Sequence, residues 1–314
     1  MNAALNLLVD THRYCSDVNQ ADRTVRVDLF KLVADLAYHA MLVEVHLTPK
    51  PGLVDLLNNG AHDDMDVRLF ERSAEAIRPY IMEFLQAGFA HRTQTADDLL
   101  TPLRPIGIAA EQAMFKATGG VNTHKGMIFS LGLICGAVGW LKGKGLAVDS
   151  LHISHTIKRC CALLVIKELK QPTHRPTTHG EKLFHEYGLT GARGEAASGL
   201  ATITEHSLPA LQAALEQGHS TEQALWQTLL VLMAHNPDTN VVSRGGMHGL
   251  RFVQNAAHDL LERGGCEWDG LENALIELDK RFTERRLSPG GSADLLAMTW
   301  LLAQLNDLNQ HSVG

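Results

Sequence analysis

The chain contains 314 residues, of which 45% are hydrophobic and 20% are charged, and its net charge is −7 with the histidines counted as neutral. This composition is ordinary for a soluble globular protein, and the acidic balance disfavours nucleic acid as a partner. Five cysteines without a C-x-x-C pair argue against a disulfide framework or a zinc site and suit the cytoplasm. No signal-peptide pattern is present, and no apolar stretch reaches the ~20 residues of a membrane span, so we expect no membrane partner.

Helical periodicity runs through most of the chain, because apolar residues return every three or four positions and no alternating strand pattern is found. We therefore predict an all-α fold. It is a single compact bundle of about a dozen helices, in which Gly-rich loops at the helix starts form the site. Residues 1–23 are polar and are predicted to be a loosely attached leader, and residues 24–314 form the helical domain.

The first predicted helix begins at Thr24 and carries Glu44 at the edge of its apolar stripe. Because an unpaired buried carboxylate is costly, we interpret Glu44 as paired, as a metal ligand or as a catalytic group. The alternative is a glutamate that reaches solvent at the helix end.

The later helices are predicted from the same periodicity and from their capping residues. Segment 127–141 has no charged residue and is too short to span a membrane, so it is predicted to be a core helix whose glycines let neighbouring backbones approach. The other predicted helices are 67–91, Thr95–Leu103, one opened by Pro105 and running to about Ala117, one capped by Asp149 or Ser150 and running to Leu169, 195–217, 220–235, and a terminal helix with Ser292 as its N-cap. Residues 170–180 are predicted to be an exposed loop.

The most informative stretch is GGVNTHKG, residues 119–126, which directly precedes the core helix. Its two glycines permit a sharp turn and a close approach to a ligand. Asn122 and Thr123 are good helix caps, and the free N–H groups of a helix start beside Lys125 would make a cradle for an anion. The alternative is an ordinary turn and cap with a solvated lysine.

Four further stretches combine glycine with charged or polar residues: KPGLVD (50–55), TGARGE (190–195), DTNVVSRGG (238–246) and LSPGGSADLL (287–296). Arg193 and Arg244 are suited to phosphate. The run Asp238-Thr239-Asn240 offers oxygen donors suited to Mg²⁺. Asp55 and Asn58 lack a simple structural explanation. Each stretch also has an ordinary interpretation as a cap, a turn or a solvated loop.

Together these loops indicate a polyphosphate–Mg²⁺ site at one end of a helical bundle. The stretches that carry them also resemble a known family, the triphosphoribosyl-dephospho-CoA synthases that serve citrate lyase, with a branch that serves malonate decarboxylase. The resemblance runs from about Tyr38 to Leu305 and rests on TPKPGLVDLLNNGAHDDMD, LRPIGIAAEQAMFKATGGVNTHKGMIFSLGL, YGLTGARGEA, DTNVVSRGG and LSPGGSADLL.

The resemblance implies a pentosyltransferase that converts ATP and 3′-dephospho-CoA into 2′-(5″-triphosphoribosyl)-3′-dephospho-CoA and adenine. The product is the precursor of the prosthetic group of an acyl carrier protein. Mg²⁺ is the expected cofactor and the cytoplasm the expected location. A homo-oligomer and a downstream acyl-carrier-protein transferase stay open as partners.

This chemistry needs a base for the incoming hydroxyl and an acid or hydrogen bond for the leaving adenine. Our hypotheses name Glu195 and Asp294 as candidates for the base, and Glu44 and Asp238 as ligands of Mg²⁺. The predicted substrate-binding residues are Lys50, Lys125, Arg193 and Arg244 for phosphates, Asp55, Asn58 and His124 for ribose or adenine, and Ser292.

Three other functions stay open at this point. A Mg²⁺-dependent N-glycoside hydrolase would use the same groups but pass the ribosyl group to water. A non-catalytic nucleotide- or CoA-binding protein would bind through the same loops. In a helical interaction protein the loops would be caps and turns only.

Overall fold

The computed structural model describes residues 28–170 and 178–311. The predicted leader and most of the loop predicted at 170–180 lie outside these ranges. The described residues form twelve α-helices, together with short 3₁₀ and π segments, and contain no strand. The prediction of an all-α fold with about a dozen helices is confirmed.

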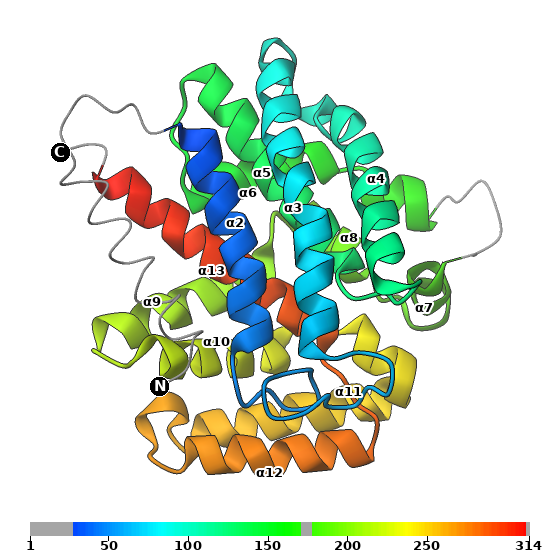
Figure 1. Ribbon diagram of the computed structural model, residues 1–314, viewed down its shortest axis with the longest axis vertical. Coiled ribbons are helices and arrows are strands. Elements are labelled where there is room, and N and C mark those ends of the chain that lie inside the picture. The colour runs from blue at the N-terminus through cyan, green and yellow to red at the C-terminus, as the bar shows by residue number, and fades with distance from the viewer. Residues whose placement is uncertain (1–27, 171–177, 312–314) are drawn as a thin grey trace.

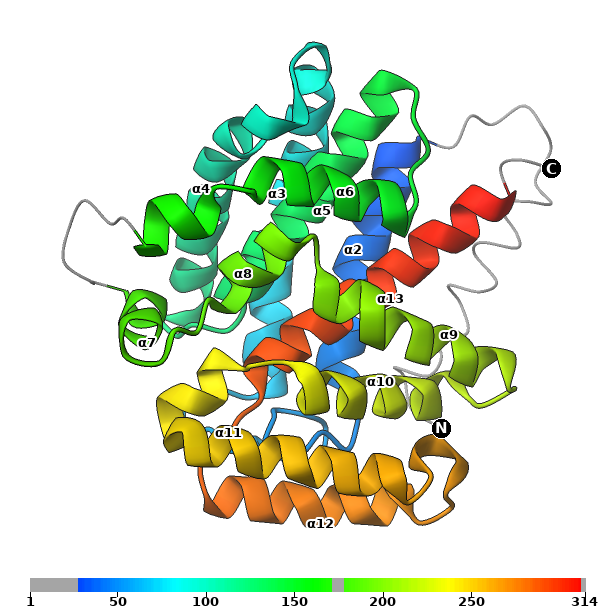
Figure 2. The same ribbon diagram turned by 180° about the vertical axis from the view of Figure 1, so that it is seen from behind.

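The helices form two groups joined by the last helix (Figures 1 and 2). Helices α2 to α6 make one bundle, α9 to α12 lie across its lower end, α7 and α8 lie on its flank, and α13 runs diagonally between the two groups. The helices are α2 (Leu29–His46), α3 (Val67–Ala90), α4 (Leu100–Thr118), α5 (Lys125–Lys144), α6 (Ser150–Cys161), α7 (His179–Tyr187), α8 (Gly191–Ser198), α9 (Leu208–Glu216), α10 (Thr221–His235), α11 (Thr239–Glu262), α12 (Leu271–Glu284) and α13 (Gly290–His311).

Helix α5 is the centre of the core, as its uncharged sequence predicts. It is buried from Met127 to Leu141 apart from Phe129. In the described part of the chain it is the one helix long and apolar enough to cross a membrane, but 78% of that stretch is buried inside the protein. It is therefore a core helix.

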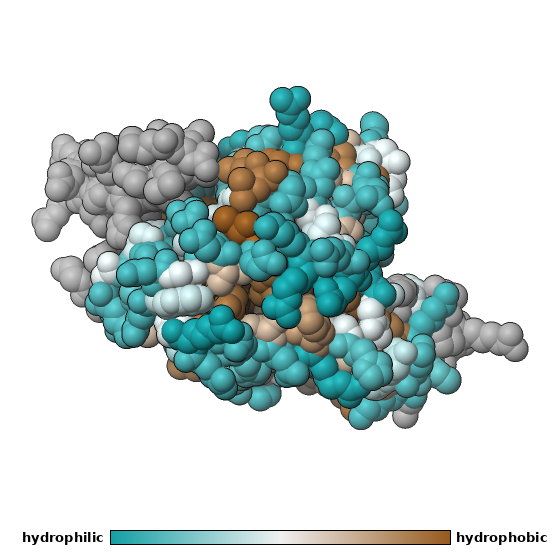
Figure 3. Space-filling view, turned by 90° about the horizontal axis from the view of Figure 1, so that it is seen from below, coloured by the Kyte–Doolittle hydropathy of each residue, from teal (hydrophilic) through white to brown (hydrophobic). Residues whose placement is uncertain are grey.

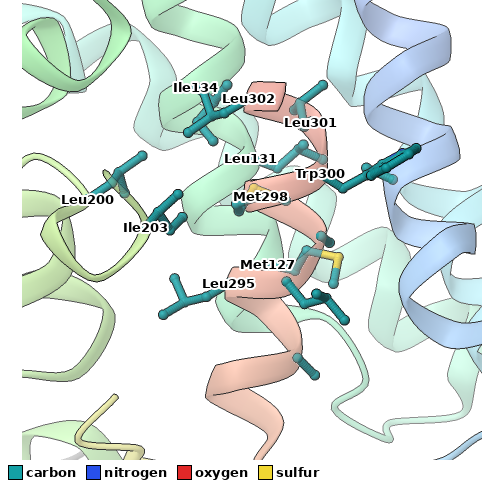
Figure 4. Close-up of a cluster of buried hydrophobic side chains, with 14 of the residues drawn as sticks. Met127, Leu131, Ile134, Leu200, Ile203, Leu295, Met298, Trp300, Leu301 and Leu302 are labelled. Atoms are coloured by element: carbon teal, nitrogen blue, oxygen red, sulfur yellow. The ribbon is translucent and has the colours of Figure 1, made fainter. Parts of the chain in front are cut away.

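The core packing explains the glycines of α5 and the burial of α13. A side chain at Gly139 would overlap the carbonyl oxygen of Leu85, so this position allows α3 and α5 to cross closely. On its other side α5 packs against α13, with Met127 and Leu131 facing Met298 (Figure 4). Hydrophobic residues are also seen among mostly hydrophilic side chains on the lower face (Figure 3).

Four predicted helix boundaries are wrong. Pro105 does not open a new helix but lies inside α4, because so near the helix start it removes only one backbone hydrogen bond while Leu103 and Ala110 pack in the core. The helix after Asp149 ends at Cys161, before the π segment Ile166–Lys170.

The helix predicted at 195–217 is interrupted as well. Gly199 and Leu200 both take positive φ angles, 84° and 63°, which no α-helix continues. Helix α8 therefore stops at Ser198, and α9 starts only at Leu208.

The predicted N-cap of the last helix is also misplaced. Helix α13 begins at Gly290, so Ser292 lies in its first turn. The backbone N–H of Ser292 donates to the carbonyl of Pro289 and to the carboxylate of Asp238, and its hydroxyl donates to the same carboxylate. Ser292 thus joins α13 to the start of α11 instead of capping its own helix.

Candidate active site

One cavity of about 610 Å³ lies where the two groups of helices meet α13. The starts of α5, α8, α11 and α13 all reach it, so residues from the four glycine-containing stretches near residues 119, 190, 238 and 287 face the same space. Its charged and histidine lining residues are Glu44, His62, His124, Lys125, Glu195, Asp238, Arg244 and Asp294.

The four helix starts bring the positive ends of helix dipoles to the cavity, where they offset part of the charge of its four carboxyl groups. Helix N-termini carry unpaired N–H groups and about half a positive charge each, which favours a bound anion. The first turns of α5 and α8 hold little side-chain bulk, since Gly126, Gly191 and Gly194 line the cavity there. A polyanionic ligand can therefore approach the backbone closely.

Among the carboxyl groups that line the cavity, Asp294 is the least engaged by other residues. It lines the cavity, and its Oδ2 atom lies so close to Gly126 that a side chain there would overlap it. Burial raises the pKa of Asp294 well above its ordinary value, and the nearby carboxylates of Glu44 and Asp238 raise it further. No hydrogen bond joins its side chain to the part of the chain that the structure describes. Asp294 therefore holds its proton to a higher pH than an ordinary aspartate, and its side chain is accessible to a ligand.

Asp238, in contrast, is a structural cap that also faces the cavity. Its Oδ1 accepts the backbone N–H groups of Asn240 and Val241 at 2.9 and 3.5 Å, and its Oδ2 accepts the N–H and hydroxyl of Ser292 at 2.8 and 3.0 Å. Burial nevertheless raises the pKa of Asp238. It fixes the starts of α11 and α13 relative to each other.

Glu44 is paired with Lys50, and both side chains are buried, with relative exposures of 4% and 1%. The Lys50 Nζ atom lies 2.5 Å from Oε1 of Glu44 and also donates to the Glu44 carbonyl oxygen. Of the interpretations of Glu44, paired is correct, and the solvent-reaching alternative is excluded. Glu44 lines the cavity, whereas Lys50 does not.

Glu195 is held mainly by Thr202. The backbone N–H of Thr202 donates to Oε1 at 2.9 Å, and the Thr202 hydroxyl donates to Oε2 at 2.7 Å. Burial raises the pKa of Glu195, and the Thr202 hydrogen bonds oppose this shift. Both residues line the cavity.

The cationic groups of the cavity lie on different helices. Lys125, at the start of α5, pairs with Glu111 of α4 at 3.0 Å. Its backbone N–H donates to Oδ1 of Asn122, but the N-cap of α5 is His124 and not the predicted Asn122 or Thr123. Arg244 donates to the carbonyl of Ala61 at 2.9 Å and to Nδ1 of His62 at 3.1 Å. Both are exposed enough to reach a ligand.

Five of the predicted substrate-binding residues do not line the cavity. Asp55 is buried and accepts the backbone N–H groups of Lys50, Leu57 and Asn58. The Asn58 amide donates to Asp279 of α12, and Arg193 pairs with Glu168 at 2.8 Å. With Lys50 and Ser292, these residues hold the loops that surround the cavity.

Sequence reasoning missed two lining residues that have a clear structural role, Thr202 and Ser288. The Ser288 hydroxyl lies 2.8 Å from Nε2 of His62, which fixes the loop before α3 against the start of α13. The serine sits inside the quoted stretch LSPGGSADLL, whereas Thr202 carries no motif and is identified only by its contact with Glu195.

The carboxylates of the cavity were tested for a fit to Mg²⁺. Within the described residues no group of three or more His, Cys, Asp or Glu side chains is close enough to hold a metal ion alone. Mg²⁺ commonly keeps several waters and is bound through one or two carboxylates and the phosphates of a substrate. Glu44 and Asp238, which both line the cavity, fit that second arrangement.

Helix starts, cationic groups and a carboxyl group with a raised pKa around one cavity fit an enzyme that acts on polyanionic substrates. Residues 30–313 match the family described as CitG, ATP:dephospho-CoA triphosphoribosyl transferase, and the chain belongs to this family. It is therefore a transferase.

Close relatives match over nearly the whole chain. A probable 2-(5″-triphosphoribosyl)-3′-dephosphocoenzyme-A synthase of Photobacterium profundum is 60% identical, over 98% of both chains. A protein of the same name from Vibrio cholerae is 59% identical, over 98% of this chain and 97% of its own. The 2-(5″-triphosphoribosyl)-3′-dephosphocoenzyme-A synthase of Pectobacterium atrosepticum is 55% identical, over 84% of this chain and 86% of its own. No solved structure matches the chain.

Proposed function

We propose that the cavity transfers the 5′-triphosphoribosyl group of ATP to the 2′-hydroxyl of 3′-dephospho-CoA. The bond between C1′ of the ATP ribose and N9 of adenine breaks, and a bond from C1′ to the 2′-oxygen of dephospho-CoA forms. The hydroxyl loses its proton to a base, and adenine leaves after gaining one. The triphosphate stays on the transferred ribose.

The observation that carries this proposal is the position of Asp294, a carboxyl group with a raised pKa that lines the cavity beside Gly126 at the start of α5. Loss of adenine from C1′ creates negative charge on the base, and a proton donor relieves it. Asp294 has the raised pKa and the free position that such a donor requires. We therefore assign it as the acid for adenine, in place of our earlier hypothesis that it is the base.

Glu195 is the stronger candidate for the base. Burial raises the pKa of its carboxyl, which makes its carboxylate a better proton acceptor, and Thr202 holds both oxygens in one orientation. The pair follows a general pattern in which two carboxyl groups in different environments take opposite roles. Inversion at C1′ would place them on opposite faces of the ribose.

The triphosphate would be held by the helix starts, Lys125 and Arg244. Mg²⁺, when bound, would neutralise part of the phosphate charge, and Asp238 and Glu44 are the residues that would hold it. We propose that Arg193, Asp55 and Asn58 act indirectly, because each is engaged by another residue of the protein.

The cellular setting is also part of the proposal. The product would be the precursor of the prosthetic group of citrate lyase or malonate decarboxylase, passed on to an acyl-carrier-protein transferase. A cytoplasmic location agrees with free thiols at the four cysteines in the described ranges and with the burial of α5.

The test is a product analysis of the purified chain with ATP, Mg²⁺ and 3′-dephospho-CoA, with each substrate omitted in turn. Adenine and triphosphoribosyl-dephospho-CoA should form together, and only when both substrates are present. Adenine formed without dephospho-CoA would indicate the hydrolase instead. Bound nucleotide without turnover would indicate a binding protein.

A further inference from the structure

We propose that Ser73 of α3 fixes His124 as a neutral imidazole with its proton on Nε2, and that this N–H donates a hydrogen bond to the nucleoside part of ATP. The inference rests on the proposed function and deepens it. In this arrangement His124 is a hydrogen-bond donor to the substrate, and its own protonation state is fixed. Ser73 does not line the cavity and acts as the positioning residue of His124.

Three side chains form a short hydrogen-bonded chain beside the cavity. The hydroxyl of Thr123 donates to the Ser73 hydroxyl oxygen at 2.6 Å, and that oxygen lies 2.7 Å from Nδ1 of His124. Ser73 is completely buried, and His124 is only 1% exposed. The order of donors and acceptors along this chain is therefore set by the protein and not by water.

The position of the proton on His124 follows from this order. The Ser73 oxygen accepts from Thr123, and Nδ1 of His124 is the one acceptor for the Ser73 proton within the described residues. A nitrogen that accepts carries no proton, so in a neutral ring the proton lies on Nε2. Burial, and then the charge of Lys50, lower the pKa of His124 to about 3, so the ring is neutral at physiological pH.

The Nε2–H group has no partner within the described structure, although the ring itself is firmly held. Phe70 packs edge-on against the ring with centroids 5.0 Å apart, and the backbone N–H of His124 donates to the sulfur of Met114. A buried donor without an acceptor destabilises the folded protein. Because His124 lines the cavity, a bound ligand can supply the missing acceptor.

The charges near His124 indicate which part of ATP accepts the hydrogen bond from Nε2. Lys125, Arg244 and four helix starts are available to the phosphates, whereas His124 brings a donor without charge. A neutral donor suits a neutral acceptor, which in ATP means an adenine ring nitrogen or a ribose hydroxyl oxygen. His124 therefore binds the nucleoside that is cleaved, on the same helix start that contacts Asp294 through Gly126.

The tautomer can be measured without any activity. In full-length protein labelled with ¹⁵N-histidine, the ring signals of His124, assigned by their loss in His124→Gln, should show a protonated Nε2 and an unprotonated Nδ1 that do not titrate between pH 5.5 and 8. In Ser73→Ala the Nδ1 signal should move toward that of a protonated nitrogen. A protonated Nδ1 in the unsubstituted protein, or a titrating ring, would overturn the inference whatever the enzyme catalyses.

Kinetics test the contact with substrate. His124→Leu removes the donor and should lower kcat/KM by about 10²-fold, the usual effect of losing one well-placed donor, while His124→Gln, which keeps an N–H near the Nε2 position, should recover most of it. Neither variant should remove a limb from the pH profile of kcat/KM. Loss of a limb between pH 5 and 8 would make His124 an acid–base group and contradict a neutral donor.

Ser207 is a matched control for Ser73, because it is equally buried and its hydroxyl lies 2.7 Å from that of Thr299. Neither Ser207 nor Thr299 lines the cavity. Ser73→Ala should lower kcat/KM about 3- to 10-fold, the value of one hydrogen bond, and Ser73→Thr should restore it. Ser207→Ala should leave kcat/KM unchanged. Equal losses in both alanine variants would mean that Ser73 acts only through stability.

Substrate analogues identify the acceptor. 7-Deaza-ATP, 3-deaza-ATP, 2′-deoxy-ATP and 3′-deoxy-ATP each lack one acceptor, and the analogue that lacks the partner of His124 should react no worse with His124→Leu than ATP does. If each of the four analogues lowered kcat/KM relative to ATP by the same factor in His124→Leu as in the unsubstituted protein, His124 would not contact the nucleoside.

Discussion

The Oδ2 atom of Asp294 lies directly against the α-carbon of Gly126, with no room between them for a methyl group. Asp294 comes from the start of α13 and Gly126 from the start of α5, so two helices that are far apart in sequence meet at the carboxyl group to which we assign proton donation. The contact with Asp294 therefore requires a glycine at position 126, and helix capping alone would not.

Gly126→Ala should impair catalysis without unfolding the protein. Alanine favours the helical conformation that Gly126 already has, but its methyl group must displace the Asp294 carboxyl. Because small displacements of reacting groups cost up to about 10²-fold, we expect kcat to fall at least about tenfold in steady-state assays.

The matched control for Gly126→Ala is Gly107→Ala in α4, where the nearest atom to an added methyl group is Cζ of Phe84 at 4.0 Å. This variant should keep full activity and an equal or higher Tm. Unchanged kcat in Gly126→Ala would mean that Asp294 tolerates displacement and is not the proton donor.

Asp294→Asn should lose activity and gain stability. Activity should fall by about 10²–10⁴-fold, the usual contribution of an acid–base group. The folded state raises the pKa of Asp294, through burial first and then through Glu44 and Asp238. Its contribution to stability is therefore fully present below the pKa of the unfolded chain, near 4, and is lost as the pH rises toward the folded pKa.

The stability difference between Asp294→Asn and the unsubstituted protein should consequently depend on pH. It should be small near pH 4 and exceed about 1 kcal/mol near pH 7, since one pKa unit corresponds to about 1.4 kcal/mol. Denaturant titrations at both pH values measure it. A difference that is the same at pH 4 and pH 7 would show that Asp294 has an ordinary pKa.

The buried pair of Glu44 and Lys50 should matter for stability more than for phosphate binding. Lys50→Met leaves the Glu44 carboxylate buried without its cation, which typically costs about 3–5 kcal/mol. Adding Glu44→Gln should restore part of this loss, because the uncompensated charge is then removed.

Chemical denaturation of the two single variants and the double variant measures the coupling of this pair. The KM for ATP of Lys50→Met, measured where the variant is folded, should stay within about threefold of the original value. Additive stability losses would exclude the pair as a unit, and a tenfold rise in KM would return Lys50 to the phosphate site.

The two arginines predicted to hold phosphate should differ. Arg244 lines the cavity, so Arg244→Ala should raise the KM for ATP or dephospho-CoA about tenfold or more, the value of a charge-assisted hydrogen bond. Arg193 pairs with Glu168 outside the cavity lining, and Arg193→Ala should change either KM less than about threefold. Steady-state kinetics with each substrate varied in turn separates the two, and the opposite order would contradict the geometry.

The sequence predicts the helical class and the buried α5 well, because an uncharged stretch with apolar residues at helical spacing has few other solutions. It predicts less well where a loop folds back on an earlier element. Lys50 lies between two prolines just after the end of α2, and the sequence predicts it to be a phosphate ligand. Its side chain instead turns back to Glu44. No local pattern reports such a contact.

Other misses have local causes. The hydrogen bonds of Asp55 to the N–H groups two and three residues further on are a common turn arrangement, so this residue could have been interpreted as structural. The break at Leu200 could not, because a leucine with positive φ has no sequence signal. The glycine loops meet at one cavity only because α13 returns between the two helix groups, which is a property of the whole fold.

The most direct test of the account is the fate of the ribose in H₂¹⁸O. The full-length protein is given ATP carrying ¹³C in its ribose, Mg²⁺ and unlabelled 3′-dephospho-CoA, and the products are analysed by mass spectrometry. Transfer to dephospho-CoA should give adenine and one adduct of dephospho-CoA that contains the ¹³C-ribose, all three phosphates and no ¹⁸O. Ribose triphosphate carrying one ¹⁸O at C1 would show that water, and not the 2′-hydroxyl, accepts the ribosyl group, and would contradict this transfer.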